Sequence, residues 1–440
     1  MPHSVSLIDE NHLLYGNFIG LQYAFAKGLD KDALSNSVIE LTAQFPALSG
    51  RYSAKSNSVT TSAKDKSFSI HHPASLAVHS HPGTLKRVMM ASDRPQFVIQ
   101  PKRKSVLNGS APLSSFTLTE FSEGGMIFGM AISHALTDAA GYHLLMKHLS
   151  GIYDAIVSDK AVDQFPFATQ LDVFEFGTQR SKAESLNVLK QRGLPKPIPI
   201  KGLFGSFVKS LITKAMDKSL SDNPPISIHF GPDDVARLKQ TVFKESGEDW
   251  ISTNVALCAH FTSIIATLSY GDDIKYDMQI GQLLDLRNRY FETNSKTQSA
   301  YVGNAILIHI DKAAFPNGLQ NTSRGELARY FKQRQTKTNA ADVKDRLDLL
   351  ADCLRHGYTN PELDVKNPII SLNNQSKMAV YDVSFNGQSP ARIYPQDVGD
   401  NIMFFPAPDG GIDIHIRDIV NPQGQQNLLT SEWQKRIFDF

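Results

Sequence analysis

Residues 124–145, "GGMIFGMAISHALTDAAGYHLL", contain the pattern that decides how this chain is expected to fold. Residues 124–134 form a nearly continuous apolar run, which is typical of a strand buried on both faces. After this run the apolar positions recur at helical spacing, at Tyr142, Leu145, Met146, Leu149, Tyr153 and Ile156. The pattern predicts a buried strand, a short turn and a helix, and the turn holds His134 and Asp138.

Length and composition are typical of a soluble globular protein with two domains. The chain has 440 residues, which is too long for one ordinary core and predicts two domains of about 200 residues each. Apolar residues make up 41% of the chain and charged residues 20%. The formal net charge of +1 argues against nucleic acid as a partner, because proteins that bind phosphate backbones usually carry a basic excess.

Cysteine content and hydropathy favour a reduced, cytoplasmic protein, which we expect to be a monomer. Cys258 and Cys353 are the only cysteines, so the sequence has neither a disulfide framework nor a cysteine-based metal motif. Residues 1–20 lack the pattern of a secretory signal, and no run of 18 apolar residues predicts a membrane span. Residues 69–82 carry four histidines, but their spacing fits no ordered metal site and favours a surface loop.

A proline-rich stretch marks the expected boundary between the domains. Residues 192–202, "RGLPKPIPIKG", hold three prolines within five positions, which disfavour helix. We therefore expect an N-terminal domain at 1–190, a structured crossover at 191–225 with a helix within 203–220, and a C-terminal domain at 226–440 from which a segment can return to the first domain. Further patterns predict helices at 30–48, 231–242 and 251–270, strands at 275–290 and 301–310, and a hairpin at 400–419.

The turn after the first buried strand is the candidate for chemistry. A histidine has an ordinary pKa of about 6.5, so His134 could accept a proton near neutral pH. An HxxxD pattern alone fixes two positions in five, however, and chance matches are frequent. On that motif alone, a hydrogen-bonded structural histidine at the end of a strand is the more common interpretation.

Other segments of the chain favour a catalytic over a structural interpretation of His134. "SHALTDAAG" resembles the HxxxDG motif of the BAHD acyltransferases, which use acyl-CoA. Segments in the family's order along nearly the whole chain are similar to its other motifs. They are "SLIDENHLLYGNFIGLQYAF" (6–25), "LTAQFPALSGRY" (41–52), "ISTNVALCAHF" (251–261), "LDLRNRY" (284–290), "AYVGNAI" (300–306), "MAVYDVSFNGQSP" (378–390) and "FFPAPDGGIDIHI" (404–416).

The resemblance implies an α/β fold of the α+β type, with two similarly folded chloramphenicol-acetyltransferase-like domains, mixed sheets and a solvent channel between the domains. It implies transfer of an acyl group from acyl-CoA, as co-substrate, to a hydroxyl or amine of a small specialised metabolite. His134 would be the general base without a covalent acyl-enzyme, and no cofactor would be permanently bound. Asp138 would turn away and pair with Arg287, or failing that with Arg289.

Several positions depart from the family pattern. Ala139 stands where the motif glycine is expected, and a glycine follows only at Gly141. Within the stretch that resembles DFGWG, Ser384 replaces the aspartate and Gly387 the tryptophan, while Phe385 and Pro390 are kept. Asn373 and Asn374 replace a threonine–serine pair, which makes Asn373 a candidate donor to the oxyanion.

The sequence allows alternatives for the CoA contacts and for the function. Ser252 and Thr253 lie at an expected helix start, so they could contact the phosphates of CoA or simply cap the helix. A condensation domain fed by a carrier protein is an alternative function, although Ser133 stands where that family has a second histidine. A degenerate binding protein is the non-enzymatic alternative, and the sequence does not identify the acyl group or the acceptor.

Overall fold

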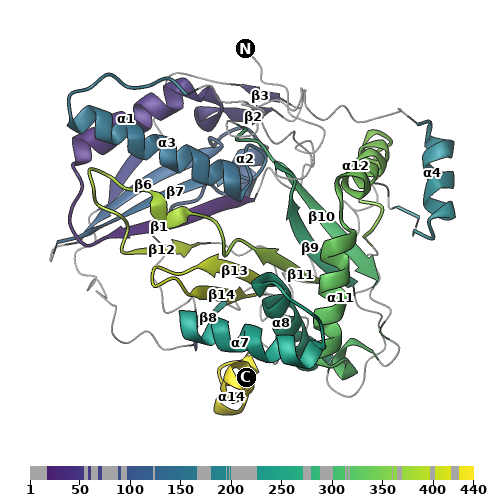
Figure 1. Cartoon of the computed structure of the whole chain (residues 1–440). Helices are drawn as coiled ribbons and strands as arrows, with labels where there is room; N and C mark the ends of the chain where they lie inside the picture. Colours follow the sequence, from purple (N-terminus) through teal and green to yellow (C-terminus); the bar gives the residue numbers. More distant parts are fainter. Residues whose placement is uncertain are drawn as a thin grey trace.

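The computed structural model contains two large mixed sheets, each covered by helices (Figure 1). It describes residues 17–53, 58–60, 68–71, 88–90, 97–121, 124–165, 180–194, 196–197, 199, 225–270, 279–287, 301–312, 315, 318–358, 360–363, 369–396, 402–417 and 426–440. The expected α/β class with two mixed sheets is confirmed.

The first sheet has five strands in the order β12-β1-β7-β6-β4. Its strands are β1 (Phe18–Phe25), β4 (Phe68–His71), β6 (Ser114–Glu120), β7 (Met126–Ser133) and β12 (Arg392–Pro395). The sheet is mixed because β4 and β6 run parallel while the other pairs are antiparallel. All eight residues of β7 are buried, as their continuous apolar run predicts.

Two helices cover one face of this sheet, α1 (Lys31–Gln44) and α3 (Ala139–Val157). Both predicted helix starts are confirmed, because Asp30 and Asp138 each accept a hydrogen bond from a backbone amide in the first turn. The apolar stripe of α3 packs against the strands in one core. This core includes Tyr142, Leu145, Met146, Leu149, Leu21, Tyr23, Phe128 and Met130.

The second sheet has seven strands in the order β10-β9-β11-β13-β14-β8-β5. Its strands are β5 (Val88–Met90), β8 (Ile226–Phe230), β9 (Gln279–Asp285), β10 (Ile306–Lys312), β11 (Ile369–Asn374), β13 (Ile402–Pro406) and β14 (Ile412–Ile416). Strand β11 runs parallel to β9 and β13, and β13 and β14 form the predicted hairpin.

Four helices accompany the second sheet: α7 (Pro232–Ser246), α8 (Thr253–Tyr270), α11 (Arg324–Lys337) and α14 (Ser431–Phe438). Helix α8 contributes many apolar side chains to the core of this half. None of the described helices is long and apolar enough to cross a membrane.

The two halves exchange strands. Strand β12 comes from the C-terminal half but pairs with β1, and β5 comes from the N-terminal half but pairs with β8. The core around α3 likewise includes Val302 and Phe405. The predicted boundary and the predicted return of a C-terminal segment to the first domain stay predictions, and residues 200–224 lie outside the described part.

A smaller unit is formed by α4 (Lys182–Gln191) and α12 (Ala340–Arg355). Leu189 of α4 and Cys353 of α12 pack together with Tyr358 in a small apolar cluster. The remaining elements are short: β2 (Arg51–Ser53), β3 (Ser58–Thr60), α2 (Arg103–Leu107) and the 3-10 turns Pro46–Ser49, Leu319–Asn321 and Val380–Asp382. The helix predicted within 203–220 lies outside the described residues. Of the histidine-rich stretch, residues 69–71 belong to β4 and the rest also lies outside them.

Candidate active site

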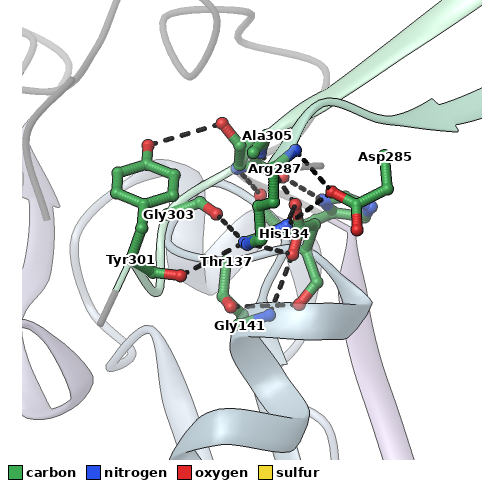
Figure 2. A network of polar contacts seen from close by, with 10 residues as sticks. His134, Thr137, Gly141, Asp285, Arg287, Tyr301, Gly303 and Ala305 are labelled. Atoms are coloured by element: carbon green, nitrogen blue, oxygen red, sulfur yellow. Dashed lines mark hydrogen bonds and ion pairs between the residues drawn. The ribbon is translucent and has the colours of Figure 1, made fainter. Parts of the chain in front are cut away.

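His134 follows the last residue of β7 and is half-buried. Its backbone amide donates to the carbonyl oxygen of Asn17 at 2.8 Å, which extends the pairing of β7 with the start of β1 by one residue. Its ring Nδ1 lies 3.0 Å from Oδ1 of Asn304. Figure 2 shows His134 close to Arg287 and to the segment that carries Gly303 and Ala305. The ring is therefore held at one nitrogen by a residue 170 positions away in the sequence.

Asn304 makes a second contact with the same histidine. Its Nδ2 donates to the backbone oxygen of His134 at 2.7 Å. Asn304 is fully buried, and it precedes β10 in the loop that ends at Ala305. The amide thus contacts both the ring and the backbone of His134, which restricts the rotation of the ring.

Asp138 is only 2% exposed and uses its carboxylate away from His134. It caps α3 by accepting from the amide of Gly141 at 2.9 Å. Both carboxylate oxygens bind Arg287, at 2.8 and 2.9 Å, and Oδ2 also accepts from the amide of Ala305 at 2.7 Å. Four donors surround this carboxylate, so its geometry is that of a buried structural anion.

Arg287 stands just beyond β9 and connects Asp138 to the segment 301–305. It donates to the carbonyl oxygens of Gly303 at 2.8 Å and Tyr301 at 3.3 Å, and it also contacts Asp285. Burial alone lowers the pKa of the Arg287 guanidinium, but the charge of Asp138 and its hydrogen bonds outweigh burial and raise it. The pairing expected for Asp138 is thus seen with Arg287, while Arg289 lies outside the described residues.

Gly141, two positions after the expected motif glycine, occupies a place where a side chain would not fit. A Cβ at this position would lie 2.1 Å from the backbone oxygen of Val302 and 2.4 Å from Oγ1 of Thr137. Only glycine lets the first turn of α3 approach the 301–305 segment this closely. Ala139 begins the helix, and the glycine two positions later provides the space.

Ser252 and Thr253 lie at the start of α8, as predicted. Oγ of Ser252 accepts from the amide of Val255 at 3.2 Å and donates to Oε1 of Gln335 at 3.2 Å. Ser252 is therefore an N-cap, which was the simpler of the two interpretations. A contact with CoA stays a prediction for both residues.

Asn373 is a half-buried residue of β11, in register with Met403 of β13. The preceding Leu372 packs into the core of the second half, whereas Met403 packs into the core that contains α3. Because side chains alternate along a strand, Asn373 lies on the face turned toward the first half. Its neighbour Asn374 donates to Asn254 at 2.6 Å, which ties the end of β11 to the start of α8.

The departures around Ser384 fall in a tight turn. Phe385 and Gln388 exchange backbone hydrogen bonds of 2.9 and 3.0 Å, and Asn386 and Gly387 between them have φ values of 49° and 77°. Glycine adopts such a backbone without strain, whereas a tryptophan would be strained there. The retained Phe385 is fully buried and packs edge-on against Phe25 at 5.5 Å between ring centroids.

The described residues therefore bring together His134, Asp138 and Arg287, and they add Asn304 to the site. Asn304 belongs to the segment 300–306 that resembles a family motif, but the sequence predicts no contact for it. A polar residue just before an apolar strand does not by itself predict a contact, because the partner of Asn304, His134, lies 170 positions away. Ser252 and Thr253 lie at the start of α8, and Asn373 lies in β11.

Comparison with known proteins identifies the family. The model of the Transferase family matches residues 23–417. The chain belongs to this family, that of the BAHD acyltransferases. The recognition from sequence is therefore confirmed, and this match favours a BAHD enzyme over a condensation domain. Among curated proteins, no sequence match is found.

Solved structures place the BAHD chain in the same fold. TRI101 of F. sporotrichioides, solved with coenzyme A and T-2, has 14% identity and a TM-score of 0.64, with 98% of each chain covered. Vinorine synthase has 14% identity and a TM-score of 0.66, covering 98% of this chain and 92% of its own. The first condensation domain of the calcium-dependent antibiotic synthetase has 13% identity, a TM-score of 0.61 and coverage of 100% and 96%. At these identities the likeness concerns the fold alone.

Proposed function

We propose that this BAHD protein transfers an acyl group from an acyl-CoA thioester to a hydroxyl or amine of a small molecule, with His134 as general base. The observation that carries the proposal is the orientation of the His134 ring. Its Nδ1 contacts Oδ1 of Asn304 at 3.0 Å, while Asp138 binds Arg287. A ring held at one nitrogen can offer the other nitrogen to a substrate. The TRI101 structures that contain CoA with T-2 mycotoxin or deoxynivalenol support this substrate class.

The proposed reaction needs one proton carrier and no covalent enzyme intermediate. His134 takes the proton of the acceptor hydroxyl or amine as the oxygen or nitrogen attacks the thioester carbonyl, and a tetrahedral oxyanion forms. When this intermediate collapses, the carbon–sulfur bond breaks and the leaving thiolate takes the proton from His134. The products are the acylated acceptor and free CoA, and the histidine returns to its starting state.

The oxyanion requires hydrogen-bond donors that are in place before the reaction. Asn373 remains our candidate because it lies on the face of β11 turned toward the first half, and its amide can donate. One such donor typically contributes about 3–4 kcal/mol to acyl transfer. Asp138 and Arg287 have a structural role in this proposal.

The CoA site is proposed at the start of α8. Ser252 and Thr253 precede or begin a helix of 18 residues, whose first amides and positive dipole end suit a phosphate. The channel between the halves, the monomeric state, the cytoplasmic location and the lack of a permanent cofactor remain predictions.

The test is release of free CoA thiol from a panel of acyl-CoAs with alcohol and amine acceptors. We expect His134→Ala to lower the rate by about 10²–10⁴-fold, the usual contribution of a general base. His148→Ala is the matched control, because His148 is a half-buried histidine of α3 that contacts Gln44 at 2.8 Å. A folded His134→Ala variant that works at the wild-type rate would overturn the proposed base.

The same panel separates the alternative functions. A condensation-type enzyme would accept acyl groups from a phosphopantetheinylated carrier protein and not from acyl-CoA. A non-catalytic binding protein would be stabilised by an acceptor or by CoA in thermal melts but would release no thiol. Thiol release that depends on both acyl-CoA and acceptor contradicts both alternatives.

A further inference from the structure

Residues 97–100, which we call the strap, cross the face of the first sheet that lies opposite helices α1 and α3. Phe128 and Met130 of β7 belong to the core that these helices cover (Figure 1). Because side chains alternate along a strand, Gly129 between them lies on the opposite face. A Cβ on Gly129 would come within 2.4 Å of Cγ2 of Val98, so the strap packs directly on this face.

Polar side chains of the sheet hold the backbone of the strap. Thr117 of β6 donates to the carbonyl oxygen of Phe97 at 2.8 Å, and Ser115 of the same strand donates to that of Ile99. Gln22 of β1 accepts from the amide of Phe97 at 3.2 Å. The strap therefore runs antiparallel to β6 and in the same direction as β7, toward the turn that follows β7.

Ile99 lies level with a residue of β7 that is close to His134. Ser115, which binds the backbone of Ile99, pairs with Ala131 of β7. His134 follows Ala131 by three residues, and a rise of about 3.3 Å per residue places the two about 10 Å apart along the strand. Ala131 and Ala135, on either side of His134, also pack in one apolar cluster with the strap. This separation is within the length of a small organic molecule.

The strap side of the first sheet is turned toward the second half. In β12, Ile393 packs with the core on the helix side, so Arg392 projects on the strap side. Arg392 binds Asp413 of β14, in the second sheet. Just beyond β12, Gln396 donates to the carbonyl oxygen of Val98 at 2.6 Å. The strap is therefore bound to a segment that also contacts the second half.

Ile99 exposes an apolar side chain at this position. Val98 is 3% exposed and points at the sheet, whereas Ile99 is 50% exposed. We propose that Ile99 is a contact for the small-molecule acceptor and that its size and apolarity determine which acceptors are used. The apolar part of the acceptor packs on Ile99 while its hydroxyl or amine reaches His134. This inference rests on the proposed function, because it takes His134 as the base that the acceptor must reach.

The strap also limits the chemistry of the acceptor. Ile99 offers neither a charge nor a hydrogen bond, and the hydroxyls of Thr117 and Ser115 beneath it already bind the strap backbone. A charged group placed against Ile99 would lose hydration without gaining a partner, which costs free energy. The strap therefore favours an alcohol or amine with an uncharged, apolar body over a sugar or an anion.

The first test compares acceptors in the thiol-release assay with acetyl-CoA as donor. Benzyl alcohol, 2-naphthalenemethanol and tryptamine are the apolar acceptors, and glycerol is the polar one. In Ile99→Ala, the KM of the apolar acceptors should rise about tenfold, because an apolar contact is lost, while the KM of acetyl-CoA stays unchanged. Ile39→Ala is the matched control, because Ile39 is 47% exposed on α1, on the other side of the sheet. An unchanged acceptor KM in Ile99→Ala would overturn the inference.

The second test blocks the strap chemically. Cys258 and Cys353 are buried, so a maleimide reacts with the thiol introduced by Ile99→Cys. Pyrenylmaleimide attached there should abolish acceptor-dependent thiol release, while CoA should still raise the melting temperature. The same label on Ile39→Cys should change neither. Full thiol release from labelled Ile99→Cys would contradict the proposed contact.

Failure of the proposed function can be distinguished from failure of the acceptor contact. Loss of activity in His134→Ala with an unchanged acceptor KM in Ile99→Ala would keep the base and reject only the contact. If the wild type releases no thiol with any acceptor, the proposed function fails, and Nile red decides on the strap alone. Its fluorescence should then be lower with Ile99→Asp than with Ile39→Asp. Equal fluorescence would reject an apolar binding surface at the strap.

Discussion

Gly141 shows how one residue lets the two halves meet at the active site. The first turn of α3 approaches the backbone of Val302 because Gly141 has no side chain. This approach brings Asp138 within reach of Arg287 and of the amide of Ala305. The glycine therefore supports the ion pair and, through Asn304, the proposed base.

We expect Gly141→Ala to destabilise the protein by about 1–3 kcal/mol or more, since the added methyl would meet a backbone oxygen that cannot turn away. Gly151→Ala is the matched control in the same helix, because a Cβ there meets nothing within 4 Å. That control should be neutral or stabilising by up to about 1 kcal/mol. Chemical denaturation of both variants measures the difference, and equal stability would contradict the steric explanation.

At the residue scale, the motifs in the sequence predicted the pairing of Asp138 with Arg287. His134, Asp138 and Arg287 each belong to a quoted segment, and the structure brings these segments together. Asn304 could not be assigned, because its contacts with His134 bridge 170 positions and leave no local pattern. The positive φ at Gly387 could not be predicted, because a departure from a motif does not show the backbone angles.

At the scale of elements, the helices with caps and a clear period were predictable. Helices α1 and α3 and the β13–β14 hairpin follow local signals: an aspartate cap, a 3.6-residue period and a Pro-Asp-Gly-Gly turn. Strands β5 and β12 have three and four residues, which is too short for any period to show. Tertiary packing decides which strands they pair with, so the sequence does not predict that β5 and β12 pair with strands of the other half.

Helix α8 carries a buried histidine that should make stability depend on pH. Nε2 of His260 contacts the backbone oxygen of Ile437 at 2.9 Å, and Arg324 lies 3.2 Å from Nδ1. Burial, and then the charge of Arg324, lower the pKa of His260 from 6.5 to about 3. The unfolded chain thus binds a proton below pH 6.5 that the folded protein rejects, and acid favours unfolding.

From this histidine alone we expect a loss of about 2–3 kcal/mol between pH 7 and pH 4.5. His260→Gln can keep both hydrogen bonds and removes the titration, so its stability should fall less over this range. Denaturation midpoints of the two proteins at several pH values give the difference. Parallel pH curves for wild type and His260→Gln would show that His260 does not cause the acid sensitivity.

At the scale of the whole molecule, an ion pair links a strand of the first sheet to a strand of the second. Arg392 of β12, in the first sheet, binds Asp413 of β14, in the second. His229 of β8 contacts the same carboxylate at 2.8 Å and Asp409 at 3.0 Å. Burial raises the pKa of Asp413, but the hydrogen bond from His229 and the charge of Arg392 outweigh burial and lower it. The contact therefore holds a charged carboxylate between the halves.

Asp413→Asn should cost about 3–5 kcal/mol, because it leaves the largely buried Arg392 without its anion. Asp409→Asn is the matched control in the same hairpin, since Asp409 binds the same histidine but its side chain is 46% exposed. That change should cost at most about 1 kcal/mol. Arg392→Met combined with Asp413→Asn should recover part of the loss, because the pair is removed together. If Asp413→Asn proves no more damaging than Asp409→Asn, the tie between the sheets contributes little, and shared apolar packing around Val302 and Phe405 must hold the halves together.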